Sequence, residues 1–145
     1  MSIPKNSIAP GILLGGKYKV GEVLGEGGMG CVYRAENVEI GLKVAIKHLH
    51  REFSAEKEAV RRFKREAKLA ASIGHDNICE VIDFGTADDG SPFLVMPVLK
   101  GYPLSTLIHD FYPLHYSVIA DIICQTLSAL SAAHRENIVH RDLKP

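Results

Sequence analysis

The sequence predicts an α+β fold, in which a five-stranded antiparallel sheet with one helix is followed by a helical segment. Between positions 17 and 99, five stretches have the alternating or short apolar pattern that is typical of strands. One stretch within this region, and the chain after position 103, show apolar residues at helical spacing instead. Gly101 to Pro103 interrupts the pattern, which indicates a boundary between the two parts.

The composition is that of an ordinary soluble globular chain, with 46% hydrophobic and 23% charged residues among 145. Lys and Arg together number 17, as do Asp and Glu together, so the formal net charge is zero. This balance argues against a nucleic-acid partner. Three cysteines without close pairing fit a reducing compartment, and the seven histidines lack metal-ligand spacing. The most apolar later stretch, residues 116–134, is interrupted by Asp121 and Gln125 and is too polar to span a membrane. We therefore expect no membrane segment and a cytoplasmic location.

The expected elements follow one another in a simple order. Residues 1–16 contain two prolines and three glycines and are predicted to be a loosely ordered leader. The five strands are expected at Lys17–Leu24, Cys31–Glu36, Leu42–Leu49, Ile78–Phe84 and Pro92–Leu99. Because side chains alternate along a strand, Ala45 and Lys47 should share one face.

The helix between the third and fourth strands is expected at about Ser54 to Ile73, with Ser54 as its N-cap and Gly74 after its end. Glu66 lies beside its apolar stripe, and a carboxylate near an inward face needs a partner. Lys47 on the neighbouring strand is the expected partner. Two later helices are expected at about Leu104–His109 and His115–His134. The inward-facing residues of the second are predicted to be Ile119, Ile122, Ile123, Thr126, Leu130 and Ala133.

A glycine-rich stretch, Leu24 to Tyr33, has the form G-x-G-x-x-G-x-V, with Gly25, Gly27 and Gly30 in its defining positions. Glycine lets the backbone approach a phosphate closely. The β-branched and aromatic residues after Gly30 favour a strand, whereas a dinucleotide-binding turn would open a helix there. The stretch therefore predicts a hairpin over a nucleotide and argues against a dinucleotide-binding oxidoreductase.

Four motifs stand in the order that is typical of one family. The glycine stretch is followed by Val44 to Lys47, by the helix with Glu66, and by His140 to Pro145. In this order they resemble a protein kinase, and most closely the bacterial, eukaryotic-like Ser/Thr kinases. The resemblance implies an ATP-binding small lobe over residues 17–98, and the hinge end with the start of a large lobe over residues 99–145. The implied activity is transfer of the ATP γ-phosphate to Ser or Thr hydroxyls of a protein substrate.

The resemblance also implies a set of nucleotide-binding residues. In the family the glycine stretch covers the phosphates, the equivalent of Lys47 holds them, and that of Glu66 fixes the lysine. Met96 would be the gatekeeper, and Pro97 stands where the family usually has an acidic residue, although its C=O is kept. The implied ATP-binding residues are Leu24, Gly25, Gly27, Gly28, Gly30, Val32, Ala45, Lys47, Glu66, Met96, Pro97 and Leu99.

The implied catalytic residues, besides Lys47, are Asp142 and Lys144 near the C-terminus. Asp142 would accept the proton of the substrate hydroxyl, and Lys144 would neutralise charge on the transferred phosphate. The family binds Mg²⁺ through an Asn that would fall at position 147 and a later Asp-Phe-Gly segment, so no metal ligand is expected within this chain. We therefore expect residues 1–145 to be a fragment that is inactive by itself. The alternative left open is a non-catalytic module that binds a nucleotide or a partner protein.

Overall fold

The computed structural model describes residues 8–141 and 143–145, which form two compact units. The first unit spans Met1–Ser72 and Glu80–Val98 and contains the sheet, whereas the second spans Ile73–Cys79 and Leu99–Pro145 and is helical. Asp142 and residues 1–7 lie outside the described residues, so the expectations for them remain predictions.

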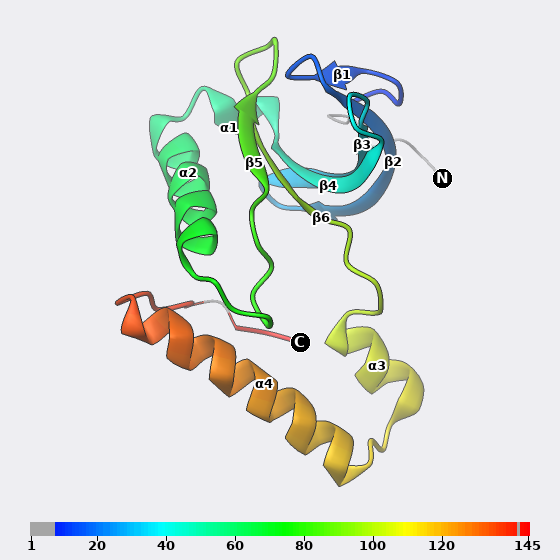
Figure 1. Ribbon diagram of the computed structural model, residues 1–145, viewed down its shortest axis with the longest axis vertical. Helices are drawn as coiled ribbons and strands as arrows, with labels where there is room; N and C mark the ends of the chain where they lie inside the picture. Colours follow the sequence, from blue (N-terminus) through cyan, green and yellow to red (C-terminus); the bar gives the residue numbers. More distant parts are fainter. Residues whose placement is uncertain (1–7, 142) are drawn as a thin grey trace. The chain divides into compact units, whose positions relative to one another are not determined.

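The sheet is antiparallel throughout and has the strand order β1-β2-β3-β4-β6-β5 (Figure 1). Its strands are β1 (Leu13–Leu14), β2 (Tyr18–Gly27), β3 (Gly30–Asn37), β4 (Leu42–Leu49), β5 (Asp83–Thr86) and β6 (Pro92–Pro97). The predicted α+β fold is confirmed, and five of the six strands overlap predicted ones. The fourth predicted strand begins later than expected, at Asp83, and β1 is an addition.

Strand β1 shows that the predicted loose order is wrong for residues 8–16. Leu14 is buried in the core, and the backbone N–H of Gly11 donates to the carbonyl of Val20 at 2.7 Å. Gly15 and Gly16 have φ values of 55° and 71°, a region that glycine enters at little cost. These two glycines, which suggested flexibility in the sequence, form the tight turn that returns the chain into β2.

The main core lies on one face of the sheet, where β3 shows the two-residue alternation clearly. Cys31, Tyr33 and Ala35 are buried, and Arg34 between them is exposed. The residues of this core are Leu14, Tyr18, Val20, Cys31, Tyr33, Ala35, Val44, Ile46, Phe93 and Val95. The apolar residues of β3, β4 and β6 therefore fix which face of the sheet is left for other contacts.

The expected helix at Ser54 to Ile73 corresponds to α2 (Lys57–Ser72), and a separate short helix, α1 (Arg51–Ser54), precedes it. Ser54 ends α1, and its hydroxyl donates to the carbonyl of His50 at 3.2 Å, so the expected N-cap role is wrong. Helix α2 packs Phe63 and Ala67 against Leu49 and Leu94, which form a second core cluster. Leu94 alternates with Phe93 and Val95, so α2 covers the sheet face opposite the main core.

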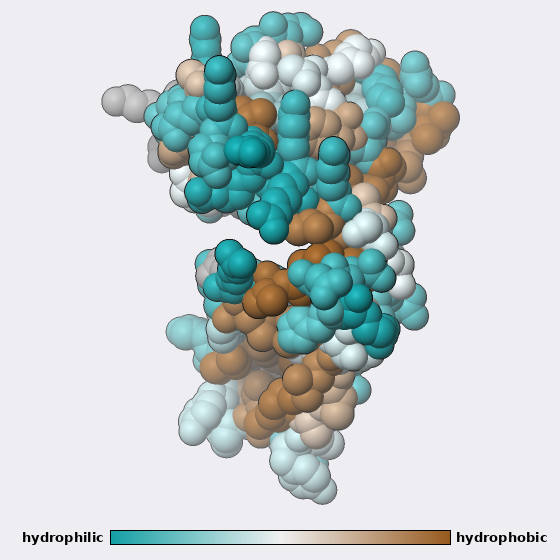
Figure 2. Space-filling view, turned by 90° about the vertical axis from the view of Figure 1, so that its left-hand side faces the viewer, coloured by the Kyte–Doolittle hydropathy of each residue, from teal (hydrophilic) through white to brown (hydrophobic). Residues whose placement is uncertain are grey.

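The second unit contains α3 (Leu104–Phe111) and α4 (Tyr116–Arg135), close to the predicted ranges. The segment before β5 bonds to α4, because the side-chain amide of Asn77 donates to Gln125 Oε1 at 2.8 Å. Ala133 is buried, but most of the apolar side chains that were expected to face inward are partly or fully exposed, Ile119 and Ile123 among them. Figure 2 shows hydrophobic residues gathered on the surface of this unit.

Helix α4 bears on the expectation that the chain has no membrane segment. Within the described part of the chain it is the one helix that is long and apolar enough to cross a membrane, although Asp121 and Gln125 lie in it. Length and composition alone are weak evidence, because core helices of soluble proteins pass the same test.

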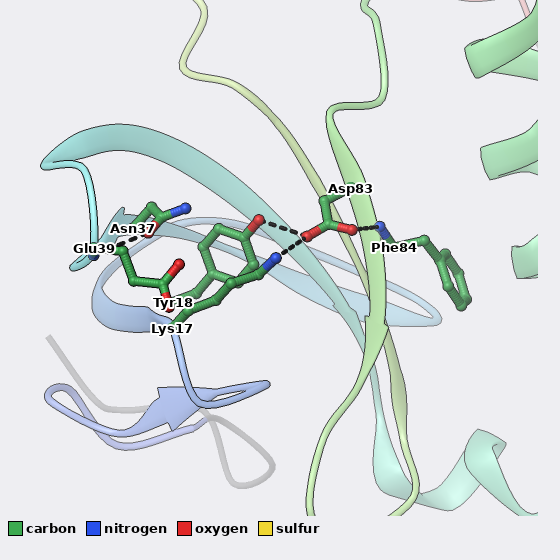
Figure 3. Close-up of polar contacts among 6 residues, drawn as sticks. All are labelled: Lys17, Tyr18, Asn37, Glu39, Asp83 and Phe84. Atoms are coloured by element: carbon green, nitrogen blue, oxygen red, sulfur yellow. Dashed lines mark hydrogen bonds and ion pairs between the residues drawn. The ribbon is translucent and has the colours of Figure 1, made fainter.

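Asp83 joins two strands that are not neighbours in the sheet (Figure 3). Its Oδ2 accepts a hydrogen bond from the Tyr18 hydroxyl at 2.7 Å and lies 2.8 Å from the Lys17 ammonium, while its Oδ1 accepts from the N–H of Phe84. The hydrogen bond to Lys17, followed by that to Tyr18, lowers the pKa of Asp83. The carboxylate therefore connects β5, at one edge of the sheet, to the start of β2 near the other edge.

Replacing Asp83 by asparagine is expected to lower the free energy of unfolding by about 1 kcal/mol at neutral pH. Because the pKa of Asp83 is lowered by folding, this contribution is present above the unfolded pKa and is lost as the pH falls through the folded one. Urea unfolding of both proteins should therefore show a difference at neutral pH that shrinks below a pH of about 4. The exposed Asp88, replaced in the same way, is the control. Equal effects of the two substitutions would contradict the prediction.

Candidate active site

The glycine stretch forms a hairpin between β2 and β3. Gly27 is paired with Gly30, and Gly25 with Val32, so Gly28 and Met29 make the turn. The chain continues from Gly30 directly into β3, as the residues after the third glycine predicted. The hairpin is therefore formed by the paired ends of β2 and β3.

Strand register gathers four of the expected ATP-binding residues on one face of the sheet. Lys47 is paired with Val32, and Ala45 with Met96. Directly opposite residues point to the same side, and so do residues two apart on one strand. Val32, Ala45 and Met96 thus make an apolar surface beside the Lys47 ammonium, on the face opposite the main core.

Lys47 and Glu66 are brought together from β4 and α2. The distance between Lys47 Nζ and Glu66 Oε2 is 3.5 Å, and Nζ also lies 5.7 Å from the centre of the Phe63 ring. Both charged side chains are more than a third exposed, and an exposed pair of this kind stabilises a fold by only about 0–1 kcal/mol. The contribution of the pair lies in the placement of the ammonium more than in stability.

A small hollow borders this ion pair, and Arg62 lines it together with Lys47, Phe63 and Glu66. The sequence interpretation left Arg62 out of the site. A signal for it exists, because Arg62 precedes Glu66 by four residues and such residues lie on one side of a helix. Arg62 adds a second positive charge to this side of the sheet.

The other expected site residues do not all lie in the first unit. Pro97 ends β6 opposite Val44, and Leu24 lies in the exposed part of β2. Leu99 and Lys144 belong to the second unit, and Asp142 is outside the described residues. The first unit thus holds the expected adenine and Lys47 side of the site.

One tripeptide, Asp83-Phe84-Gly85, has the letters of the segment with which protein kinases bind magnesium. The structure places it in β5, paired with β6, and its carboxylate bonds to Tyr18 and Lys17 (Figure 3). The Asp83 carboxylate of this tripeptide therefore has a structural role in the sheet.

A glycine hairpin above a strand lysine that pairs with a helix glutamate is the arrangement by which one class of phosphotransferases holds ATP. The comparisons with known proteins agree. The protein kinase domain family matches residues 18–145. Serine/threonine-protein kinase pkn3 of Myxococcus xanthus is 41% identical over 129 residues, which are 89% of this chain and 24% of that protein. Serine/threonine-protein kinase PrkC of Bacillus subtilis is 40% identical over 91% of this chain and 20% of its own length.

Among solved structures, the PknI kinase domain of Mycobacterium tuberculosis is similar, with a TM-score of 0.79 and 31% identity over 96% of this chain and 56% of that one. The chain belongs to the protein kinase family, and its relatives are serine/threonine kinases. It spans about a fifth to a quarter of the length of the curated relatives that it matches.

Proposed function

We propose that this chain supplies the ATP-binding half of a Ser/Thr protein kinase. In the complete domain, the γ-phosphate of ATP would pass to a Ser or Thr hydroxyl of a protein substrate. The observation that supports the proposal most directly is the Lys47–Glu66 ion pair beside the apolar face of Val32, Ala45 and Met96. An adenine needs an apolar surface and its phosphates need a fixed positive charge, and this face provides both.

Each residue has a distinct part in the proposed site. Val32, Ala45 and Met96 contact the adenine, and the carbonyl of Pro97 and the N–H of Leu99 form hydrogen bonds with its edge. Lys47 holds the α- and β-phosphates, and Glu66 orients its ammonium. The backbone of the glycine hairpin covers the phosphates. A Cβ added at Gly25 or Gly28 would meet no protein atom within 4 Å, so there is room for a phosphate beside this backbone.

The catalytic step is proposed to use Asp142 as the acceptor of the hydroxyl proton and Lys144 as the positive charge beside the transferred phosphate. Mg²⁺ supplies charge neutralisation in the family, and it prefers oxygen ligands in octahedral geometry. The residues that hold Mg²⁺ in the family are an Asn five positions after the Asp142 equivalent and a later Asp-Phe-Gly segment, neither of which is within residues 1–145. We propose that residues 1–145 alone bind ATP without transferring phosphate.

The test compares ATP binding by residues 1–145 with that of two lysine variants. Lys47→Ala is expected to weaken binding at least tenfold, because a charge-assisted contact to phosphate contributes roughly 1.5–3 kcal/mol. Lys43→Ala is the matched control, since Lys43 lies on the same strand and side but pairs with Glu36. Titration calorimetry gives both affinities. Equal affinities for wild type and Lys47→Ala would refute the proposed phosphate contact, and phosphate transfer by the wild-type chain would refute its inactivity.

A further inference from the structure

A carboxylate, a thiol and an imidazole converge at the glycine hairpin, on the side away from the proposed ATP site. They belong to Glu26, Cys31 and His50, and one possible ligand atom of each lies within 4.8 Å of the other two. All three residues are in the first unit. Cys31 and Val32 are neighbours in β3, so their side chains point to opposite faces of the sheet. The cluster and the apolar adenine surface therefore occupy different sides of the same hairpin.

The backbone holds the three residues in place without any contribution from a ligand. Glu26 is paired with Cys31 across the β2–β3 hairpin. His50 directly follows β4, and its N–H donates to the carbonyl of Met29 at 3.0 Å, which ties it to the hairpin turn. A group of ligands carried on paired strands is preorganised, and binding then costs little conformational entropy.

The imidazole of His50 gives an independent reason to consider a ligand here. His50 is 6% exposed, and its Nδ1 is buried without a hydrogen-bond partner in the part of the chain that the structure describes. A buried polar atom without a partner costs about 1–3 kcal/mol. Coordination of a cation through Nδ1 would remove that cost, because neutral imidazole can bind a metal through this nitrogen.

The kinds of ligand indicate which cation fits. A thiolate, an imidazole and a carboxylate are the donor types of Zn²⁺, whereas Mg²⁺ and Ca²⁺ prefer oxygen ligands alone. Cys31 and His50 are buried and Glu26 is exposed, so one side of the cluster is open to water. Cysteine binds a metal as the thiolate, so the thiol proton of Cys31 would pass to solvent as the sulfur–metal bond forms.

We propose that Glu26, Cys31 and His50 bind one Zn²⁺ ion, with water in the open fourth position. The ion would link the glycine hairpin, in which Glu26 stands between Gly25 and Gly27, to His50 at the end of β4. The metal site and the proposed ATP site would thus share one hairpin while using different residues of it.

The test uses Co²⁺ as a spectroscopic substitute for Zn²⁺, with the untagged 145-residue chain under reducing conditions. A thiolate bound to Co²⁺ gives a charge-transfer absorption that neither component has alone. We expect this absorption to saturate at one Co²⁺ per chain and to disappear when Zn²⁺ is added. Cys31→Ser should abolish it, and Cys124→Ser, which changes the exposed free cysteine of α4, should leave it unchanged.

Because Cys31 is buried, its substitution could also disturb folding, and Glu26→Gln separates the two effects. Glu26 is exposed, so this variant should fold normally and bind Co²⁺ at least tenfold more weakly. Three outcomes would overturn the proposal. These are no absorption in the wild-type chain, an absorption that depends on Cys124, or equal Co²⁺ affinity for wild type and Glu26→Gln.

Discussion

Replacing Gly30 by alanine is expected to lower the free energy of unfolding by about 3 kcal/mol, the upper part of the range for overpacked positions. A Cβ at this position would lie 2.2 Å from the carbonyl oxygen of His48 and 3.1 Å from its carbon. Both atoms belong to the backbone of β4, so no side chain can move aside. β3 and β4 would have to separate where Gly30 is paired with Leu49. Urea unfolding followed by circular dichroism measures the loss.

Gly28→Ala is the matched control for this prediction. A Cβ at Gly28 would meet no atom within 4 Å, and its φ is outside the left-handed region, so we expect a change within about 0.5 kcal/mol. Equal losses in the two variants would contradict the role assigned to the β4 backbone. The glycines of the motif thus differ in why the structure has glycine at each position. Gly30 is required by the close approach of two strands, whereas the fold imposes no such requirement on Gly28.

The sequence predicted the elements whose signal is local and repeated. Alternation over eight residues was enough to place β4, and with it Ala45 and Lys47 on one face. β1 has two residues, which is too short for a periodic signal, and its turn glycines resemble those of a flexible segment. The break between α1 and α2 was missed because the residues around Ser54 suit a helix start, and only the structure shows its hydroxyl bonded back to His50.

The site was predictable where it follows from one strand or from one unfavourable charge. The expectation that Glu66 needs a cationic partner led to Lys47, and the structure places the two charges 3.5 Å apart, although both side chains are more than a third exposed. Which residues lie beside Lys47 depends on strand register, and periodicity within single strands does not determine it. The same limit applies to Glu26, Cys31 and His50. They come from three different strand ends, so spacing along the chain gave no indication of a shared cluster.

Phe93→Ala is expected to lower the free energy of unfolding by about 3–5 kcal/mol, the range for loss of a buried aromatic ring. The side chain is 1% exposed, and its ring packs edge-on against Tyr18, with 6.1 Å between ring centres. Two glycines leave the space that the ring fills. A Cβ at Gly15 would lie 3.1 Å from the ring, and one at Gly85 would lie 2.4 Å from it. One side chain of β6 therefore supports both the β1–β2 turn and β5.

The position of the ring is tested most sharply by combining Phe93→Ala with Gly85→Ala. Alone, Gly85→Ala should be destabilising, because its methyl group would overlap the ring. Once Phe93 is alanine, the obstructing atoms are gone, so the second substitution should cost far less. Urea unfolding of the four proteins gives this coupling energy. Phe111→Ala, at a side chain that is 62% exposed, is the control for losing a phenyl ring. Additive costs for Phe93→Ala and Gly85→Ala would show that the ring does not fill the space beside Gly85.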